Sequence, residues 1–93
     1  MKQDKVTVID KKGNLIICDI LFTYKDDKYN KDYIVYTDRT LDENGHLKAY
    51  GAIYHPENLS LGLEEIKEKK EWKVLITILE SIQNHKILTI VNN

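Results

Sequence analysis

Residues 21–56 constrain the fold of this chain most, because they hold all six of its tyrosines around the turn sequence Asp42-Glu43-Asn44-Gly45. The residues on both sides of this turn are rich in β-branched and aromatic side chains, which favour strands. Gly45 can adopt a positive φ, as a type I turn followed by a bulge requires. The region therefore predicts a β-hairpin with strands near residues 32–39 and 47–55. Pro56 ends the second strand, since it has no amide proton to donate.

The turn also predicts the register of this hairpin. If Asp42 pairs with His46, counting outwards gives the opposed residues on both faces of the sheet. On one face these are Tyr36 with Ala52, Asp38 with Tyr50 and Ile34 with Tyr54, and on the other face Val35 lies opposite Ile53. The side of the sheet that carries Tyr36, Tyr50, Tyr54 and Asp38 is called the tyrosine face below.

Apolar periodicity predicts the remaining elements. Short β-type runs indicate strands near residues 5–10 and 15–24, and the second is apolar on both faces, as a central strand would be. Residues 59–64 alternate leucine with Ser60, Gly62 and Glu64, and they predict a possible fifth, edge-like strand. Near residues 68–84 the period changes to that of an amphipathic helix. Its apolar stripe consists of Trp72, Leu75, Ile76, Leu79 and Ile82.

These elements predict a single α+β domain over residues 1–93, with an antiparallel sheet of four or five strands and one C-terminal amphipathic helix packed on one face. The tail, residues 85–93, contains an apolar, β-prone run. Periodicity leaves three alternatives for this tail: a last strand, an extension of the helix or a docked tail. With 42% hydrophobic and 31% charged residues, the chain has the composition of a globular protein.

Charge and cysteine content narrow the class of protein. Fourteen basic and fifteen acidic side chains interleave along the chain, whereas nucleic-acid binders usually concentrate positive charge. The single cysteine, Cys18, excludes an internal disulfide. The first residues contain no apolar signal core, and no uncharged run approaches the ~20 residues that span a bilayer. We therefore expect a cytoplasmic protein without a membrane segment.

Polar residues that could hold a metal or catalyse a reaction lack the required spacing. Residues 26–32 imitate a calcium loop, but Lys28 takes a ligand position and no glutamate closes the loop. Cys18 and the three histidines show no spacing typical of a zinc site. Cys18 and Asp19 lie in an apolar run, where a core thiol and an edge-facing or lysine-paired carboxylate are the simpler interpretations. We therefore predict no catalytic residue, no metal and no cofactor.

A series of segments, taken in order, matches a known pattern. The segments are residues 21–24, 31–38 and 42–45, Tyr50, residues 54–56 and 61–66, and the pair Glu71-Trp72 at the start of the helix. They resemble the YrzB-like family of small bacterial proteins, domain of unknown function 1292 (UPF0473-type), over roughly residues 5–82. The chain departs from the family pattern at Lys28-Tyr29-Asn30 and after Asn84. The resemblance implies no substrate, cofactor or catalytic residue.

The tyrosine face is the feature that points to a function. Tyrosine offers a rigid apolar body and a hydroxyl at low entropic cost, so an open face with Tyr36, Tyr50 and Tyr54 would suit a protein partner. The helix could instead cover this face, and the sequence leaves both arrangements open. We predict a small protein-interaction or regulatory module. A nucleic-acid-associated accessory protein is the alternative, although Asp38 and Glu43 lie where nucleic acid would need Lys or Arg, and an enzyme comes third.

Overall fold

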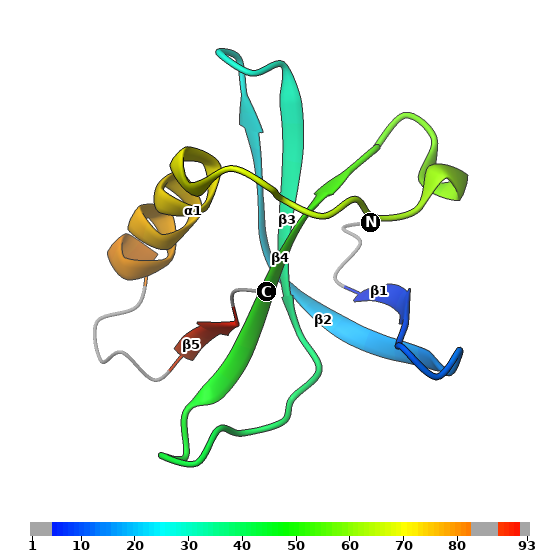
Figure 1. The fold of residues 1–93 in the computed structure, drawn as a ribbon, viewed down its shortest axis with the longest axis vertical. Helices are drawn as coiled ribbons and strands as arrows, with labels where there is room; N and C mark the ends of the chain where they lie inside the picture. The colour runs from blue at the N-terminus through cyan, green and yellow to red at the C-terminus, as the bar shows by residue number, and fades with distance from the viewer. Residues whose placement is uncertain (1–4, 83–87, 92–93) are drawn as a thin grey trace.

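A computed structural model describes residues 5–82 and 88–91, and this part of the chain forms a sheet with one α-helix (Figure 1). The elements are β1 (Lys5–Ile9), β2 (Leu15–Asp26), β3 (Lys31–Thr37), β4 (Leu47–Tyr54), the 3₁₀ turn η1 (Leu59–Leu61), α1 (Lys69–Ile82) and β5 (Leu88–Val91). Strands β1 to β4 lie in sequence order and pair antiparallel, and β5 adds to β4 in parallel. The predicted α+β class is confirmed.

The β1–β2 and β3–β4 hairpins use the same turn, and each turn is fixed by an aspartate. At the β1–β2 turn the Asp10 carboxylate accepts hydrogen bonds from the amides of Lys12 (2.9 Å) and Asn14 (2.8 Å). At the β3–β4 turn the Asp42 carboxylate accepts from the amides of Asn44 and His46 at 2.9 and 2.8 Å. Gly13 and Gly45 take positive φ values of 87° and 81° at the bulge position of these turns. The turn predicted from the sequence is therefore confirmed.

The register predicted for the β3–β4 hairpin is correct at its tip and wrong beyond it. Asp42 pairs with His46 and Leu41 with Leu47, but further along Tyr36 lies opposite Tyr50. The other observed pairs are Ile34 with Ala52, Asp32 with Tyr54, Tyr33 with Ile53 and Val35 with Gly51. The strands slip by two residues near Arg39, whose φ of 69° breaks the ladder. Because side chains alternate with a period of two, this slip leaves every residue on its predicted face.

Strand β2 contains a bulge that divides its apolar residues between the two faces of the sheet. Ile20 lies opposite Tyr36 and Phe22 opposite Val35, so the register shifts by one residue at Leu21. Ile20 therefore faces the same side as the tyrosines, and Phe22 faces the other. Strand β2 pairs with both β1 and β3, as its prediction as a central strand requires.

Helix α1 packs on the face of the sheet opposite to the tyrosine face. Its residues Trp72, Leu75 and Leu79 form the core together with Tyr33, Val35, Ala49 and Ile53 of the sheet. Trp72 is only 7% exposed and donates a hydrogen bond from Nε1 to the carbonyl of Ile66 at 3.1 Å. A β-carbon on Gly51 would lie 3.0 Å from the Trp72 ring, so the glycine makes room for the helix. Trp72 is thus a core residue, as predicted.

The structure corrects the prediction for residues 59–64, and it shows which of the three alternatives holds for part of the tail. Residues 59–61 form η1, whose first turn begins when Asn58 accepts hydrogen bonds from the amide and hydroxyl of Ser60 at 3.3 and 2.6 Å. Only Glu64 pairs with the sheet, through a bridge to Ile53. Of the tail, residues 88–91 form β5, and α1 supplies the crossover that a parallel pair needs. The predicted helix end at 84, and residues 85–87 and 92–93, lie outside the described residues.

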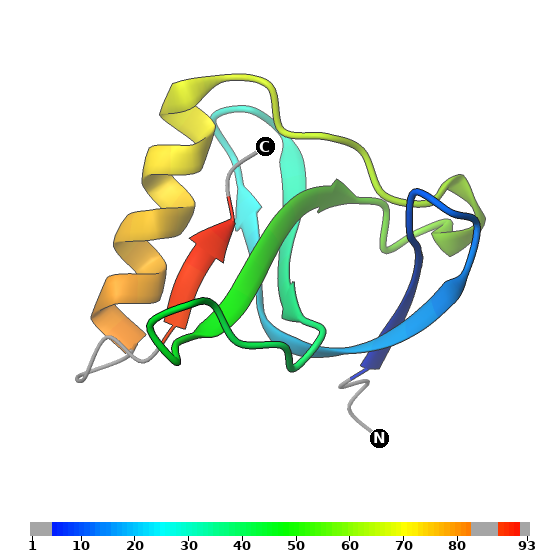
Figure 2. The same cartoon turned by 60° about the horizontal axis from the view of Figure 1, so that its bottom comes forward.

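The strands β3 and β4 lie in the middle of the molecule, with α1 on one side and the β1–β2 hairpin on the other. Both Figure 1 and Figure 2 show this arrangement. The chain from the end of β4 through η1 passes over toward β1 before it reaches the helix (Figure 2). As a result β1 and the segment that includes η1 face each other across the sheet surface that α1 leaves uncovered.

Candidate binding groove on the tyrosine face

The tyrosine face is not covered by the helix, which decides between the two arrangements left open by the sequence. Tyr36, Tyr50 and Tyr54 share one side of β3 and β4, and the residues that contact α1 alternate with them on the other side. All three side chains are partly exposed. The sheet therefore has one face that forms the core and one face that reaches solvent.

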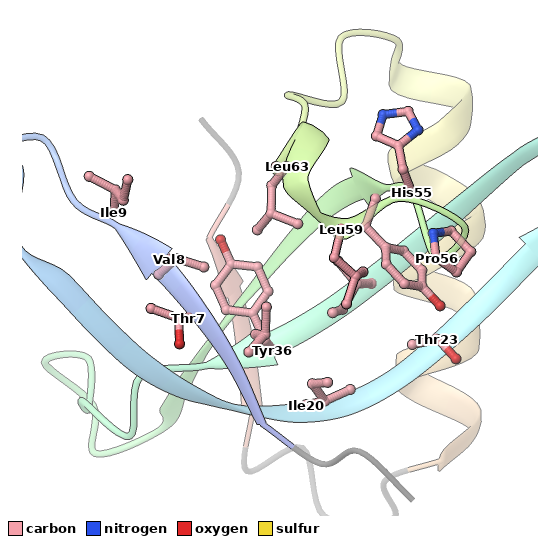
Figure 3. Close-up of a pocket in the computed structure, with 14 residues that line it drawn as sticks. Thr7, Val8, Ile9, Ile20, Thr23, Tyr36, His55, Pro56, Leu59 and Leu63 are labelled. Atoms are coloured by element: carbon pink, nitrogen blue, oxygen red, sulfur yellow. The ribbon is translucent and has the colours of Figure 1, made fainter.

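A groove of about 770 Å³ lies on the open face, between β1 and the segment of residues 55–63. Its floor includes Ile20 from β2 and Ile34 and Tyr36 from β3, and Tyr54 from β4 borders it. The walls include Val6 and Val8 from β1 and, opposite them, Leu59 and Leu63, as Figure 3 shows for most of these residues. The volume and the mostly apolar lining are those of a site that binds an organic group or a peptide side chain.

The structure separates the four residues predicted to form the surface. Tyr36 and Tyr54 line the groove, whereas Tyr50 lies behind Tyr36 and stacks on it, with ring centroids 5.7 Å apart and an angle of 21° between the rings. The Tyr50 hydroxyl donates a hydrogen bond to the Asp38 carboxylate at 3.3 Å. Asp38 and Tyr50 thus support Tyr36 from outside the groove.

Tyr36 and Tyr50 are neutral hydrogen-bonding groups at physiological pH. Burial, followed by the nearby Cys18, Tyr50 and Asp38, raises the pKa of Tyr36 to about 12. Burial and the Asp38 carboxylate also raise the pKa of Tyr50. Burial alone would raise the pKa of Asp38, but hydrogen bonds from Thr40 and Tyr50 outweigh it and keep that pKa below its usual value. Around Tyr36 and Tyr50 the face therefore presents neutral aromatic rings beside the Asp38 carboxylate.

The rim of the groove beyond Tyr54 is acidic. His55 borders the groove, and its Nε2 lies 2.5 Å from a carboxylate oxygen of Glu64. Its Nδ1 lies 3.9 Å from a carboxylate oxygen of Glu57. From residue 55 to residue 66 the chain has three glutamates and neither lysine nor arginine. A partner with positive charge would meet complementary charge at this rim.

The other polar groups singled out by the sequence have structural partners. Asp19 pairs with Lys5 at 2.5 Å and with Arg39 at 3.0 Å, which confirms its interpretation as a lysine-paired carboxylate. Cys18 is buried, and burial raises the pKa of its thiol, so it has the core role that was predicted. The Asp26 carboxylate accepts a hydrogen bond from the amide of Lys28 at 2.8 Å. Within residues 5–82 and 88–91 no three His, Cys, Asp or Glu side chains are close enough to hold a metal ion.

A buried carboxylate, for which the sequence predicted no contact with the sheet, joins the helix to the sheet. Glu71, in the first turn of α1, is buried and accepts a hydrogen bond from the Tyr33 hydroxyl of β3. The Lys31 ammonium lies 3.3 Å from the same carboxylate oxygen. Burial, and then the hydrogen bond to Glu71, raises the pKa of Tyr33. The cluster lies on the core face of the sheet, away from the groove.

Comparison with known proteins identifies the family of the chain. A UPF0473 protein of Leuconostoc mesenteroides subsp. mesenteroides is 33% identical over 88 residues, which cover 86% of this chain and 89% of that protein. The chain belongs to the UPF0473 family. A UPF0473 protein of Bacillus pumilus is 31% identical over 75 residues (78% and 79% of the two chains), and one of Bacillus thuringiensis is 28% identical over 90 residues (92% and 97%).

The family membership confirms the resemblance seen in the sequence, and it names no activity. No family model matches this UPF0473 chain, so its assignment to domain of unknown function 1292 stays a prediction. No solved structure matches it either. In the part of the chain that the structure describes, no helix has the length and apolar character needed to cross a membrane.

Sequence reasoning missed half of the groove of this UPF0473 chain. It found Tyr36 and Tyr54, but the wall residues Val6, Val8 and Leu59 come from segments far apart in the sequence. The β-type run of residues 6–9 and the alternating leucines of residues 59–64 were each interpreted as a strand. Only the curvature of the sheet shows that the two segments face each other.

Proposed function

We propose that this UPF0473 chain is a small cytoplasmic protein-interaction module that binds a protein partner in the groove of its tyrosine face. The observation that carries the proposal is the difference between the two faces of the sheet. Helix α1 covers one face, and the other face holds an apolar groove. Leu59 on the groove wall is 61% exposed, and a partner bound in the groove would remove its side chain from water. Tyrosines beside aliphatic side chains are the composition found in protein interfaces.

The charges near the groove favour a protein over a nucleic acid. Binding of nucleic acid depends on Lys and Arg that neutralise phosphates. The groove instead borders Glu57 and Glu64 through their contacts with His55. The proposal assigns no catalytic role, because the single cysteine of the chain, Cys18, is buried and the pKa of its thiol is raised.

Affinity capture with a groove variant tests the proposal. The wild-type protein and the double variant Tyr54→Ser with Leu59→Ser are immobilised and exposed to a native bacterial lysate, with and without nuclease. We expect the wild type to capture a protein in both lysates and the variant to lose it, because the variant removes two apolar contacts of the groove. The captured protein is then purified and its binding is measured directly.

A matched variant controls for the loss of a tyrosine and a leucine as such. Tyr29→Ser with Leu41→Ser changes a partly exposed tyrosine in the β2–β3 turn and an exposed leucine outside the groove. This control should capture the partner as the wild type does. Capture that disappears with nuclease, or that survives in the groove variant, would show that the proposed function is wrong.

A further inference from the structure

The outer edge of β1 offers unpaired backbone groups beside the groove. Strand β1 is the last strand on its side of the sheet. The amide of Asp10 donates to the carbonyl of Asn14 at 2.9 Å, so this pair is a hydrogen-bonded pair of the antiparallel ladder. Because such pairs alternate, the next ones are Val8 with Ile16 and Val6 with Cys18. The N–H and C=O groups of Thr7 and Ile9 therefore point away from β2, and no described strand pairs with them.

This edge and the groove lie side by side, so one ligand can use both. Val6 and Val8 share the face of Cys18 and Ile20, and they form one wall of the groove. In a strand added beside β1, every second side chain would point to this same face. Those side chains would enter the groove between Val8 and the opposite wall at Leu59 and Leu63, a space that Figure 3 shows.

The charges around the groove specify the ligand further. On the wall opposite β1, the side chains of Glu57 and Glu64 are 71% and 57% exposed. On the β1 side, the Lys5 ammonium is already paired with the Asp19 carboxylate at 2.5 Å. Both carboxylates contact His55, which lines the groove, and residues 55–66 contain neither lysine nor arginine. A basic side chain of an incoming segment would complement this pair of carboxylates beside the groove.

We infer that the groove takes an extended segment of a partner protein, which adds as a strand to the outer edge of β1. Alternate apolar side chains of the segment fill the groove, and at least one basic side chain faces Glu57 and Glu64. Main-chain hydrogen bonds to Thr7 and Ile9 supply affinity, and the groove supplies specificity. This inference rests on the proposed function and adds the mode of binding and the chemistry of the partner.

A display library of random linear peptides, selected on the immobilised protein, provides the probe. The selected peptides should alternate apolar residues, carry Lys or Arg, and lack proline at the positions whose amides face β1. Binding of a synthetic selected peptide should protect the amides of Thr7 and Ile9 from hydrogen exchange. The Val8 amide, which already bonds to β2, should exchange slowly with and without peptide. Failure to select any such peptide, or unchanged exchange at Thr7 and Ile9, overturns the inference.

Two variants separate the strand from the groove. Thr7→Pro removes an amide proton that points away from β2 and should weaken binding of the selected peptide by about tenfold or more. Thr7→Val keeps that amide proton and should bind as the wild type does. If Thr7→Pro fails to fold, the same test is made on wild-type protein with a peptide methylated at the amides that face β1. Tyr54→Ser with Leu59→Ser should also lose the peptide.

The outcomes distinguish this inference from the proposed function. If the groove variant loses the peptide but Thr7→Pro and the methylated peptide bind normally, binding in the groove stands and strand addition is wrong. If no variant changes binding, both are wrong. If the free protein is a dimer by light scattering, with Thr7 and Ile9 already protected at high protein concentration, the occupant is a second copy of the chain and the inference is overturned.

Discussion

At the scale of single residues, polar side chains fix the geometry of the sheet. Asp10 and Asp42 each hold a hairpin turn by accepting two backbone amides. Glu71 ties the first turn of α1 to Tyr33 of β3. Each carboxylate has a geometric role that depends on its own few hydrogen bonds, so single substitutions should report on it separately.

Tyr33→Phe should destabilise the protein by about 1–3 kcal/mol, because it leaves the buried Glu71 carboxylate with one hydrogen-bond donor fewer. The measurement is the free energy of unfolding in urea. Tyr29→Phe removes a hydroxyl from a partly exposed tyrosine and should leave that free energy nearly unchanged. Equal stability of both variants and the wild type would show that the Glu71–Tyr33 bond adds nothing.

The raised pKa of Tyr36 predicts a loss of stability in alkali. Its phenol ionises at about 12 in the folded protein, against 10 in an unfolded chain. A group with a raised folded pKa contributes its full stability below the unfolded pKa and loses it as the pH rises through the folded pKa. Between pH 10 and 12 the free energy of unfolding should therefore fall more steeply in the wild type than in Tyr36→Phe. Parallel pH profiles would contradict the burial of this hydroxyl.

At the scale of elements, the sequence predicted those whose signal is local. The turn at Gly45 and the helix with Trp72 and Leu75 were found because turn chemistry and helical period depend on nearby residues. The two-residue slip at Arg39 was missed, since a left-handed arginine has no sequence signature. Residues 59–64 were misassigned because the alternation of leucines does not show that Asn58 starts a 3₁₀ turn. The predicted tyrosine face is correct despite the slip, because a shift of two residues leaves each side chain on its predicted side of the sheet.

Trp72→Ala should reduce the free energy of unfolding by about 3–5 kcal/mol, as a large-to-small change in the core does. The physical reason is that Trp72 packs on Gly51 and also donates its Nε1 proton to the Ile66 carbonyl. Thr77→Ala, at an exposed position of the same helix, should change stability by less than about 0.5 kcal/mol. A loss below about 1 kcal/mol for Trp72→Ala would place this side chain at the surface.

At the scale of the whole molecule, the sheet has one packed side and one open side. The helix α1 covers the packed side, and the chain after β4 curves over the open side to make a groove against β1 (Figure 2). A second, smaller hollow of about 360 Å³ lies along α1 beside Lys69 and Lys73. The two hollows lie over different elements, so a map of binding distinguishes them.

The location of binding can be measured directly by recording amide chemical shifts of the ¹⁵N-labelled protein while the selected peptide is added. We expect the shift changes in β1, at Tyr36 and Tyr54, and in residues 55–63, which surround the groove. The amides of Lys69, Lys73 and Thr77 on the helix should not move. Changes confined to α1, with the groove residues unaffected, would contradict the assignment of the tyrosine face as the binding surface.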